Sequence, residues 1–525
     1  MADFDTTPYW QTSVALPRFR TLERDLHVDV AVIGGGITGI TAAYLLKKAG
    51  KDVALLERHR CLRGDTGHTT AHLTCVTDTR LSELVKSFGA DHARATWDAG
   101  LAAIAQIDGI VRTEGIECGF AWVPGYLHAP QRPPDSDGEQ EAEMLRAETN
   151  QIAELGFDAR YLDRVPFMNT PGIEIGGQAR FNPTQYLAAL LARVHGGGSH
   201  VFEDTSVDEI KADDSGRPLT LPAGNHTITS DYVIVATHNP IIGRAGFLSA
   251  SLLQTKLALY TSYVVAGRIP SGAIPDALFW DTSDPYNYLR LAGAKDVVIY
   301  GGSDHKTGQA EDTRACFARL EADLERLVPA VTITHRWSGQ VIETNDGLPF
   351  IGEMAPRQFA ATGFSGNGMT FGTLSAMMAT DAATGRSNPW RELFDIDRTK
   401  IRGGLWDYLT ENKDYPYYII RDRFAGAEGR SLRVLARGEG KLLDIDGERV
   451  AAYRSEDGAV TMKSPICTHM GCTVQWNSAE RTWDCPCHGS RFSPKGEVLG
   501  GPAESPLADV EFPARKERPR TRHAG

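Results

Sequence analysis

The sequence predicts an α/β fold of the Rossmann type, interrupted by further helices and antiparallel strands and followed by a C-terminal segment that carries a metal-ligand pattern. Three observations support this prediction. A strand, a glycine-rich turn, a helix and a second strand follow one another near the N-terminus. Residues 278–302 form an aromatic-rich stretch that is typical of antiparallel strands. Cysteines and histidines cluster between residues 467 and 488 of the 525 in the chain.

The first of these units has the order of a nucleotide-binding motif. Residues 28–33 are apolar and β-branched, as expected of a buried parallel strand. Residues 40–49 have apolar side chains at helical spacing, and Gly50 is a natural C-terminal stop. A second buried strand is predicted at residues 53–56. The unit therefore predicts a βαβ arrangement rather than an isolated turn.

The glycines of this unit have separate physical roles in binding a dinucleotide. Gly34 permits a tight turn, Gly36 lets a pyrophosphate approach the backbone, and Gly39 lets helix and strand pack closely. Glu57 ends the second strand, where a carboxylate accepts hydrogen bonds from a ribose and disfavours a 2′-phosphate. No second glycine fingerprint follows, and residues 231–237 (DYVIVAT) resemble a later strand of FAD-binding folds. FAD is therefore the predicted nucleotide.

With these elements, the chain up to about residue 410 resembles the D-amino-acid oxidase family of FAD enzymes. The segments PYW, ETNDGLPFIGE and ATGFSGNGMTFG are similar to elements of that family. The resemblance implies an FAD domain of the glutathione-reductase type, in pieces at about 26–80, 170–245 and 335–400. It also implies an α+β substrate domain at about 81–169 and 246–334, where residues 81–113 predict two helices and residues 139–155 another.

The same resemblance assigns flavin contacts. A loop and helix start beside the isoalloxazine ring would be formed by Gly363, Ser365, Gly366, Asn367, Gly368 and Met369. Some relatives similar to dimethylglycine dehydrogenase bind FAD covalently through a histidine in the loop after the second strand. His68 falls near the position of that histidine, although the match needs a one-residue offset at His72. The alternative is that His68 is a loop histidine without a cofactor role.

Substrate contacts are expected on the aromatic-rich strands, because in the family such a sheet covers the flavin. The candidates for catalytic or substrate-binding roles are Tyr286, Tyr288, Arg290 and His305. Each of them has the alternative of a packing or surface role.

The C-terminal cluster consists of CTHMGC and of CPCHGS, which begins thirteen positions after Cys472. Zinc would accept Cys467, His469, Cys485 and His488 as tetrahedral ligands. Zinc leaves Cys472, Cys487 and the later segment GGPAESPL without a role, whereas a Rieske [2Fe-2S] centre uses all of them.

Residues 430–513 are accordingly similar to Rieske proteins of the cytochrome bc type, which are small all-β domains. The resemblance implies that Cys467 and Cys485 hold one iron, that His469 and His488 hold the other, and that Cys472 and Cys487 form a disulfide. Ser490 matches a hydroxyl donor to a cluster sulfur. Phe492 stands where high-potential members often have a tyrosine donor, so the expected potential is lower.

The remaining features limit location and partners. Residues 411–429 are expected to be a linker and residues 514–525 a basic, solvated tail. The net charge of −12, without a basic stripe in the folded part, disfavours a nucleic-acid partner. No apolar run is long enough for a membrane span, and the N-terminus has no pattern of a secretory signal. The four scattered cysteines read as reduced thiols, so the expected location is the cytoplasm.

The combination of sites predicts an oxidoreductase that oxidises an amine or amino acid at a C–N bond. Electrons would pass from FAD to the [2Fe-2S] cluster and on to an unknown one-electron acceptor. One alternative is an oxidase that uses O₂ and has a structural or regulatory cluster. The other is an electron-transfer component that feeds an oxygenase.

Overall fold

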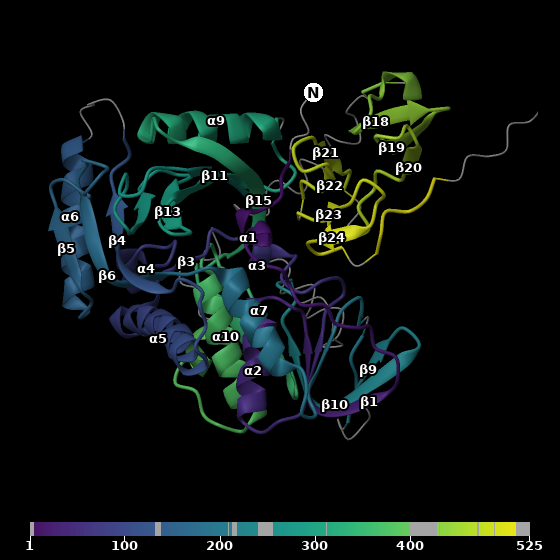
Figure 1. Cartoon of the computed structure of the whole chain (residues 1–525), viewed down its shortest axis with the longest axis horizontal. Coiled ribbons are helices and arrows are strands. Elements are labelled where there is room, and N and C mark those ends of the chain that lie inside the picture. The colour runs from purple at the N-terminus through teal and green to yellow at the C-terminus, as the bar shows by residue number, and fades with distance from the viewer. Residues whose placement is uncertain are drawn as a thin grey trace, which may run out of the picture. The chain divides into compact units, whose positions relative to one another are not determined.

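The chain divides into two compact units, Met1–Asp414 and Tyr415–Gly525 (Figure 1). The computed structural model describes residues 5–131, 138–207, 209–212, 218–239, 256–310, 312–398, 428–429, 431–469, 472–487, 489–503 and 505–510. The predicted basic tail, and the predicted linker apart from residues 428 and 429, lie outside these ranges.

The first unit contains a largely parallel sheet with strand order β16-β17-β10-β1-β2-β7. Its central strand, β1 (Leu26–Ile33), pairs in parallel with β2 (Val53–Leu56) and with β10 (His226–Val235). Strands covered on both faces need apolar side chains throughout, which explains the continuous apolar run in β1. The other strands of this sheet are β7 (His200–Phe202), β8 (Lys211–Ala212), β9 (Leu219–Ala223), β16 (Phe350–Ala355) and β17 (Gln358–Thr362).

Three helices, α2 (Ile37–Lys48), α7 (Pro183–Val194) and α10 (Gly368–Ala383), pack together beside this sheet (Figure 1). Helix α7 starts at a capping side chain, because the Asn182 Oδ1 accepts a hydrogen bond from the Gln185 N–H and proline follows at the first helical position. The short helices of the unit are α1 (Tyr9–Thr12), α3 (Asp65–His68) and α11 (Arg391–Phe394).

A second, mostly antiparallel sheet has the order β15-β11-β14-β13-β12-β4-β6-β3, with β5 paired to β6. Its strands are β3 (His72–Leu73), β4 (Ala121–His128), β5 (Ala159–Leu162), β6 (Gly172–Arg180), β11 (Leu257–Arg268), β12 (Leu278–Asp281), β13 (Tyr288–Ala292), β14 (Val297–Lys306) and β15 (Thr332–Thr344). Strand β6 and most of β15 thus belong to this sheet, although the sequence places them in the nucleotide-binding pieces.

Four helices accompany the second sheet. Helix α9 (Thr313–Leu327) covers the face of β11 and β14 (Figure 1). The others are α4 (Leu81–Phe88), α5 (Ala90–Glu114) and α6 (Gly138–Glu154). The paired helices predicted at residues 81–113 therefore correspond to α4 and α5.

The second unit consists of two small antiparallel sheets. One contains β18 (Glu439–Ile445), β19 (Glu448–Arg454) and β20 (Val460–Lys463), and the other contains β21 (Gln475–Asn477), β22 (Thr482–Asp484), β23 (Arg491–Phe492) and β24 (Val498–Gly500). A short 3-10 helix, η1 (Leu432–Val434), precedes them. Trp483 and Phe492 are fully buried in the core of this unit.

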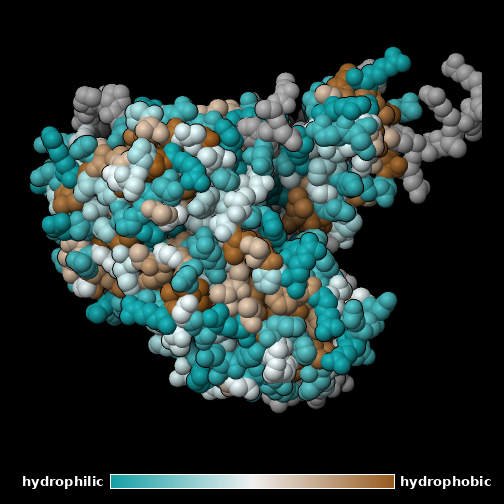
Figure 2. Space-filling view, in the orientation of Figure 1, coloured by the Kyte–Doolittle hydropathy of each residue, from teal (hydrophilic) through white to brown (hydrophobic). Residues whose placement is uncertain are grey.

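Hydrophilic residues cover much of the visible surface of the first unit (Figure 2). Among the described residues, no helix is long and apolar enough to cross a lipid bilayer.

Candidate functional sites

The glycine-rich turn after β1 has a backbone that only glycine accommodates well. Gly34 has a φ of +111°, and its N–H donates to the Leu56 carbonyl oxygen at 2.8 Å. A Cβ on Gly39 would collide with the Gly34 carbonyl oxygen, so helix α2 lies directly against the turn. Gly36 caps α2, and a Cβ there would meet only the Thr66 side chain within 4 Å. The turn thus presents an open backbone and a positive helix N-terminus to a phosphate.

Glu57 is held beside this turn. One carboxylate oxygen accepts from the Gly35 N–H at 2.8 Å, and the other accepts from the His59 N–H at 2.8 Å. These bonds fix the acid at the end of β2, where a ribose would lie. The donor and acceptor set of the turn therefore fits an unphosphorylated adenosine dinucleotide such as FAD.

A second glycine-rich segment precedes α10. Gly363, Ser365 and Gly366 have positive φ values of 73°, 42° and 76°. Asn367 is the N-cap residue of α10, and its Nδ2 donates to the Val76 carbonyl oxygen at 2.7 Å. The hydrogen bond from Asn367 ties the helix N-terminus to the loop at residues 74–80, and the partial positive charge there favours an anionic group.

Polar side chains gather where this segment meets the second sheet. The Tyr286 hydroxyl donates to the Asp78 Oδ1 at 2.8 Å. A Cβ on Gly366 would lie 3.1 Å from the Asp78 carboxylate and 3.2 Å from the Tyr286 hydroxyl. The Tyr286 and Tyr288 rings have centroids 5.7 Å apart. Asp78 and Tyr286 therefore adjoin the segment that the sequence analysis assigns to the flavin.

The strands β11, β13 and β14 complete this polar group. Ser262 donates to the Asp304 Oδ1 at 2.6 Å, and its Oγ lies 2.6 Å from the Tyr288 hydroxyl. The pairing of β11 with β14 shifts register between Thr261 and Tyr263, opposite this part of β14. Such a bulge re-aims a side chain, here bringing Asp304 to Ser262. We call Asp78, Ser262, Tyr286, Tyr288 and Asp304 the carboxylate–hydroxyl network.

Most of the network is partly buried, with Asp78 exposed at its edge, and the surrounding protein shifts its titration. Removal from water raises the pKa of Asp78 to about 6, against the lowering effect of the Tyr286 hydrogen bond. It raises the pKa of Asp304 to about 7, and the Asp78 charge adds to this shift. Asp78 nevertheless remains exposed to solvent. Enclosure raises the pKa values of Tyr286 and Tyr288, so both phenols stay protonated at neutral pH.

Arg290 and His305 are placed differently from the two tyrosines. The Arg290 guanidinium donates to the carbonyl oxygens of Leu291 and Phe181, each at 3.0 Å, and also to that of Ala71. The His305 ring stacks on Tyr263 with centroids 5.5 Å apart. Tyr263 packs in turn against Phe317 of α9, so His305 belongs to the α9 side of the sheet.

The two histidines after β2 also differ in position. His68 ends α3, and its Nδ1 lies 3.0 Å from the Gly64 carbonyl oxygen. The His72 ring meets Tyr288 edge-on with centroids 5.6 Å apart, beside the network. Burial, followed by the Arg290 charge, lowers the pKa of His72 to about 3, so this imidazole is neutral.

Three residues of the network, Asp78, Ser262 and Asp304, are missed by sequence reasoning. Asp78 and Ser262 carry no local pattern that separates them from ordinary loop and strand residues. Asp304 follows Gly301 and Gly302 within a predicted strand, and glycines in a strand interior are a signal for a bulge.

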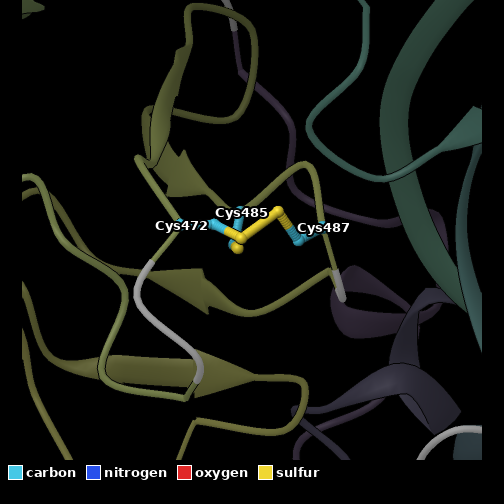
Figure 3. Close-up of side chains that lie close together, drawn as sticks. All are labelled: Cys472, Cys485 and Cys487. Carbon is cyan, nitrogen blue, oxygen red and sulfur yellow. A yellow bond between two sulfur atoms is a disulfide. The ribbon is translucent and has the colours of Figure 1, made fainter. Parts of the chain in front are cut away.

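In the second unit, a disulfide joins Cys472 and Cys487 (Figure 3). The sulfur atoms of Cys472, Cys485 and Cys487 lie within 4.8 Å of one another. Because two of these sulfurs are bonded to each other, only Cys485 of the three offers a thiolate to a metal. The Cys467 N–H donates to the Cys472 carbonyl oxygen at 2.8 Å, which ties this cysteine to the same pair of loops.

The donor set of these loops fits an iron–sulfur cluster. Cys467 and Cys485 are 2% and 1% exposed and lie outside the disulfide. The fully buried Ser490 accepts from the Ala503 N–H at 3.1 Å, which leaves its own hydroxyl proton to donate. His469 lies partly exposed in the loop that carries Cys467, whereas His488 lies outside the described residues.

A nucleotide-binding unit and a domain with paired cysteines beside a disulfide define the class of protein as a two-centre redox protein. Residues 29–382 match the family model of FAD dependent oxidoreductases (DAO), and residues 430–511 match that of the Rieske [2Fe-2S] domain. The chain belongs to the DAO family of FAD-dependent oxidoreductases and carries a C-terminal Rieske [2Fe-2S] domain.

Individual proteins match most or nearly all of the chain. The Bacillus subtilis protein YhfW, named a Rieske 2Fe-2S iron-sulfur protein, is 33% identical over 96% of this chain and 97% of its own length. The gamma-glutamylputrescine oxidoreductase of Escherichia coli is 22% identical over 81% of this chain and 99% of its own length. The solved structure of glycine oxidase from Geobacillus kaustophilus shares the fold of 71% of this chain and 99% of its own, with a TM-score of 0.59 and 19% identity.

Proposed function

We propose that this enzyme oxidises the C–N bond of a small amine or amino acid and passes the electrons to an external one-electron acceptor. When bound, FAD accepts two electrons and the [2Fe-2S] cluster carries one electron at a time. The amine substrate loses two electrons and two protons and becomes an imine. The observation that carries the proposal is the carboxylate–hydroxyl network beside Gly366. It supplies polar groups for a small substrate next to the proposed flavin segment.

The proposed FAD contacts are the residues of the two glycine-rich segments together with Glu57. The dinucleotide would be held by Gly34, Gly36, Gly39 and Glu57, and the ring by Gly363, Ser365, Gly366, Asn367, Gly368 and Met369. His72 lies beside Tyr288, and the partly buried His68 ends α3, so a covalent flavin link is tested for each histidine separately. Precipitation in acid distinguishes them, because linked flavin stays with the protein.

The proposed cluster ligands are Cys467 and Cys485 for one iron and His469 and His488 for the other. The disulfide supports this assignment, since it removes Cys472 and Cys487 from the available thiolates. Metal analysis that finds zinc, without iron and sulfide, would contradict it.

The residues of the network have proposed roles in positioning the substrate. Asp78 and Asp304 accept hydrogen bonds from substrate N–H groups, and Tyr286 and Tyr288 keep the two carboxylates oriented. A carboxylate with a pKa of about 7 also exchanges protons readily with an amine substrate at neutral pH. Relatives named for gamma-glutamylputrescine and glycine support a nitrogen-bearing small molecule.

A cytoplasmic location is part of the proposal. Cys61, Cys75, Cys118 and Cys316 are buried thiols outside any disulfide, which suits a reducing compartment. The disulfide of the second unit would then be protected within its domain.

Anaerobic titration of the purified holoenzyme tests the proposed reaction. A panel of amines and amino acids is added without oxygen, and flavin and cluster absorbance are followed separately. Substrate-dependent loss of flavin absorbance followed by reduction of the cluster supports the proposal. Fast peroxide formation in air, with a cluster that stays oxidised, would favour the O₂-using oxidase instead.

A further inference from the structure

The charge of the carboxylate–hydroxyl network restricts what the site binds. Asp78 and Asp304 are its two acidic groups, and their hydrogen bonds described above come from Tyr286 and Ser262, which are neutral. Within the described part of the chain, no cationic side chain is among the causes that shift the pKa of either carboxyl. Two neighbouring carboxylates that repel each other are stabilised by a cation placed near both.

Neither Arg290 nor His72 supplies this cation. Arg290 lies two residues from Tyr288 on β13 and is directed to the backbone carbonyl oxygens of Ala71, Phe181 and Leu291. His72 touches Tyr288 and is neutral at physiological pH because its pKa is about 3. A substrate carboxylate would therefore meet two like charges without a compensating donor from either group.

One further polar atom beside the network, the Oγ of Ser365, lacks a hydrogen-bond partner among the described residues. Ser365 is only 7% exposed and directly precedes Gly366. His72 has its Nδ1 3.1 Å from the Thr70 hydroxyl. The His72 ring also has a backbone hydrogen-bond partner at Leu289, so the Ser365 oxygen is the acceptor that remains for an ammonium N–H.

A hollow reaches the network from the side of α9. It has a volume of about 450 Å³, and its lining includes Asp304, His305 and Asp312. Arg319 also lines it and lies with its Nη2 3.3 Å from the Cys316 sulfur. The hollow gives a small cation access to Asp304 from outside.

We propose that the substrate is a diamine or polyamine without a carboxylate near its reacting carbon, and that Asp78 and Asp304 bind its second ammonium group. This inference rests on the proposed amine oxidation and narrows its substrate class. Asp78 adjoins Gly366, so the bound ammonium lies beside the flavin segment, and the length of the chain sets where along that segment the reacting carbon falls. An amino acid is disfavoured at the same place by repulsion.

Ligand binding to the holoenzyme tests this independently of turnover. The probes are 1,4-diaminobutane, butylamine, 4-aminobutanoate and succinate, which share a four-carbon chain and differ in charge. The shift of the thermal unfolding midpoint with ligand concentration gives each dissociation constant, because a ligand that binds only the folded state stabilises it. The diamine is expected to bind most tightly and succinate most weakly.

Charge-neutralising variants identify the residues responsible. Asp304→Asn and Asp78→Asn should each weaken diamine binding by about 10- to 100-fold, the usual range for a lost hydrogen bond to a charged group, and should affect butylamine less. Asp163→Asn is the matched control, since its side chain is 83% exposed and pairs with Arg146. Ser262→Ala retains both charges and provides a second variant if Asp304→Asn fails to fold.

The outcomes separate this inference from the proposed function. If 4-aminobutanoate or succinate binds as tightly as the diamine, or if Asp78→Asn and Asp304→Asn leave the preference unchanged, the inference is overturned. If amino acids bind more tightly and bleach the flavin, C–N oxidation stands while the diamine class is overturned. If the diamine binds with the expected dependence on both carboxylates but no panel member bleaches the flavin, the binding site stands and the proposed reaction fails.

Discussion

At the residue scale, the site is governed by two carboxyls whose pKa values are raised to about 6 and about 7, Asp78 and Asp304. Enclosure favours their protonated forms, and a bound cation favours their ionised forms. The identities of Asp78 and Asp304 could not be predicted from sequence, because one lies in a loop and the other reaches Ser262 through a strand bulge. The aromatic-rich segment draws attention to Tyr286 and Tyr288; the structure places Tyr288 at the start of β13 and Tyr286 in the turn before it, and their substrate role stays a prediction.

The first prediction concerns pH. Binding of 1,4-diaminobutane should strengthen as pH rises from about 5 to about 8, because Asp78 and Asp304 ionise in this range while both ammonium groups remain charged. His72 is neutral and Tyr286 and Tyr288 are protonated throughout, so they do not alter the sign. Dissociation constants measured across this range check the effect. In Asp304→Asn the rise in diamine affinity should occur at lower pH. An affinity of the wild type that does not change with pH would contradict this prediction.

The second prediction concerns Arg290. Replacement by Leu should lower the free energy of unfolding by at least about 3 kcal/mol, because three backbone carbonyls lose a charged donor. Denaturant unfolding followed by tryptophan fluorescence measures this loss. The ratio of diamine to 4-aminobutanoate affinity in the folded fraction should stay unchanged. A selective loss of amino-acid binding with normal stability would instead assign Arg290 to a substrate carboxylate.

At the element scale, the βαβ unit could be predicted because its signals are local. Residues 53–56 were predicted as a strand and are β2, and the helix predicted at 40–49 is α2, which starts earlier at Ile37. The membership of β6 and β15 in the second sheet could not be predicted in this way. Pairing between strands that are far apart in sequence depends on how the elements pack, and a local sequence pattern does not reveal it.

The third prediction tests the N-terminus of α2. Gly36→Val should abolish FAD binding, because a branched side chain would occupy the space of the pyrophosphate. The ratio of flavin to protein absorbance after purification measures retention. Gly109→Ala is the control, since a Cβ there meets nothing within 4 Å in the middle of α5. Stoichiometric flavin in Gly36→Val would remove this turn from the proposed FAD site.

The fourth prediction tests the loops of the second unit. The Cys472–Cys487 disulfide closes a sequence separation of 15 residues, for which chain entropy gives about 3 kcal/mol of stabilisation. The double variant Cys472→Ser, Cys487→Ser should therefore lose its visible cluster absorbance at lower guanidinium concentration than the wild type. Flavin absorbance should be retained to the same concentration in both proteins. Unchanged cluster loss would show that the loops do not depend on this link.

At the scale of the whole molecule, two redox modules occupy one chain, and YhfW of Bacillus subtilis matches across both. The presence of both modules could be predicted from sequence because each has a dense local motif, CTHMGC with CPCHGS in one case and the glycine fingerprint in the other. Whether electrons flow from one module to the other cannot be read from the residue pattern of either module. The mismatch between two-electron substrate oxidation and one-electron transfer is the physical reason to expect that coupling.

The most direct test of this central claim is turnover of a variant that lacks the cluster. His469→Ala should lose a proposed iron ligand and the cluster while retaining FAD, and Thr468→Ala is the neighbouring control, since its hydroxyl donates only to the Ser505 carbonyl oxygen. In oxygen-free solution, substrate should still bleach the flavin of His469→Ala in a single turnover, but steady-state reduction of a one-electron acceptor should fail. Thr468→Ala should behave like the wild type in both measurements. Steady-state turnover of cluster-free His469→Ala at the wild-type rate with every acceptor would contradict the account.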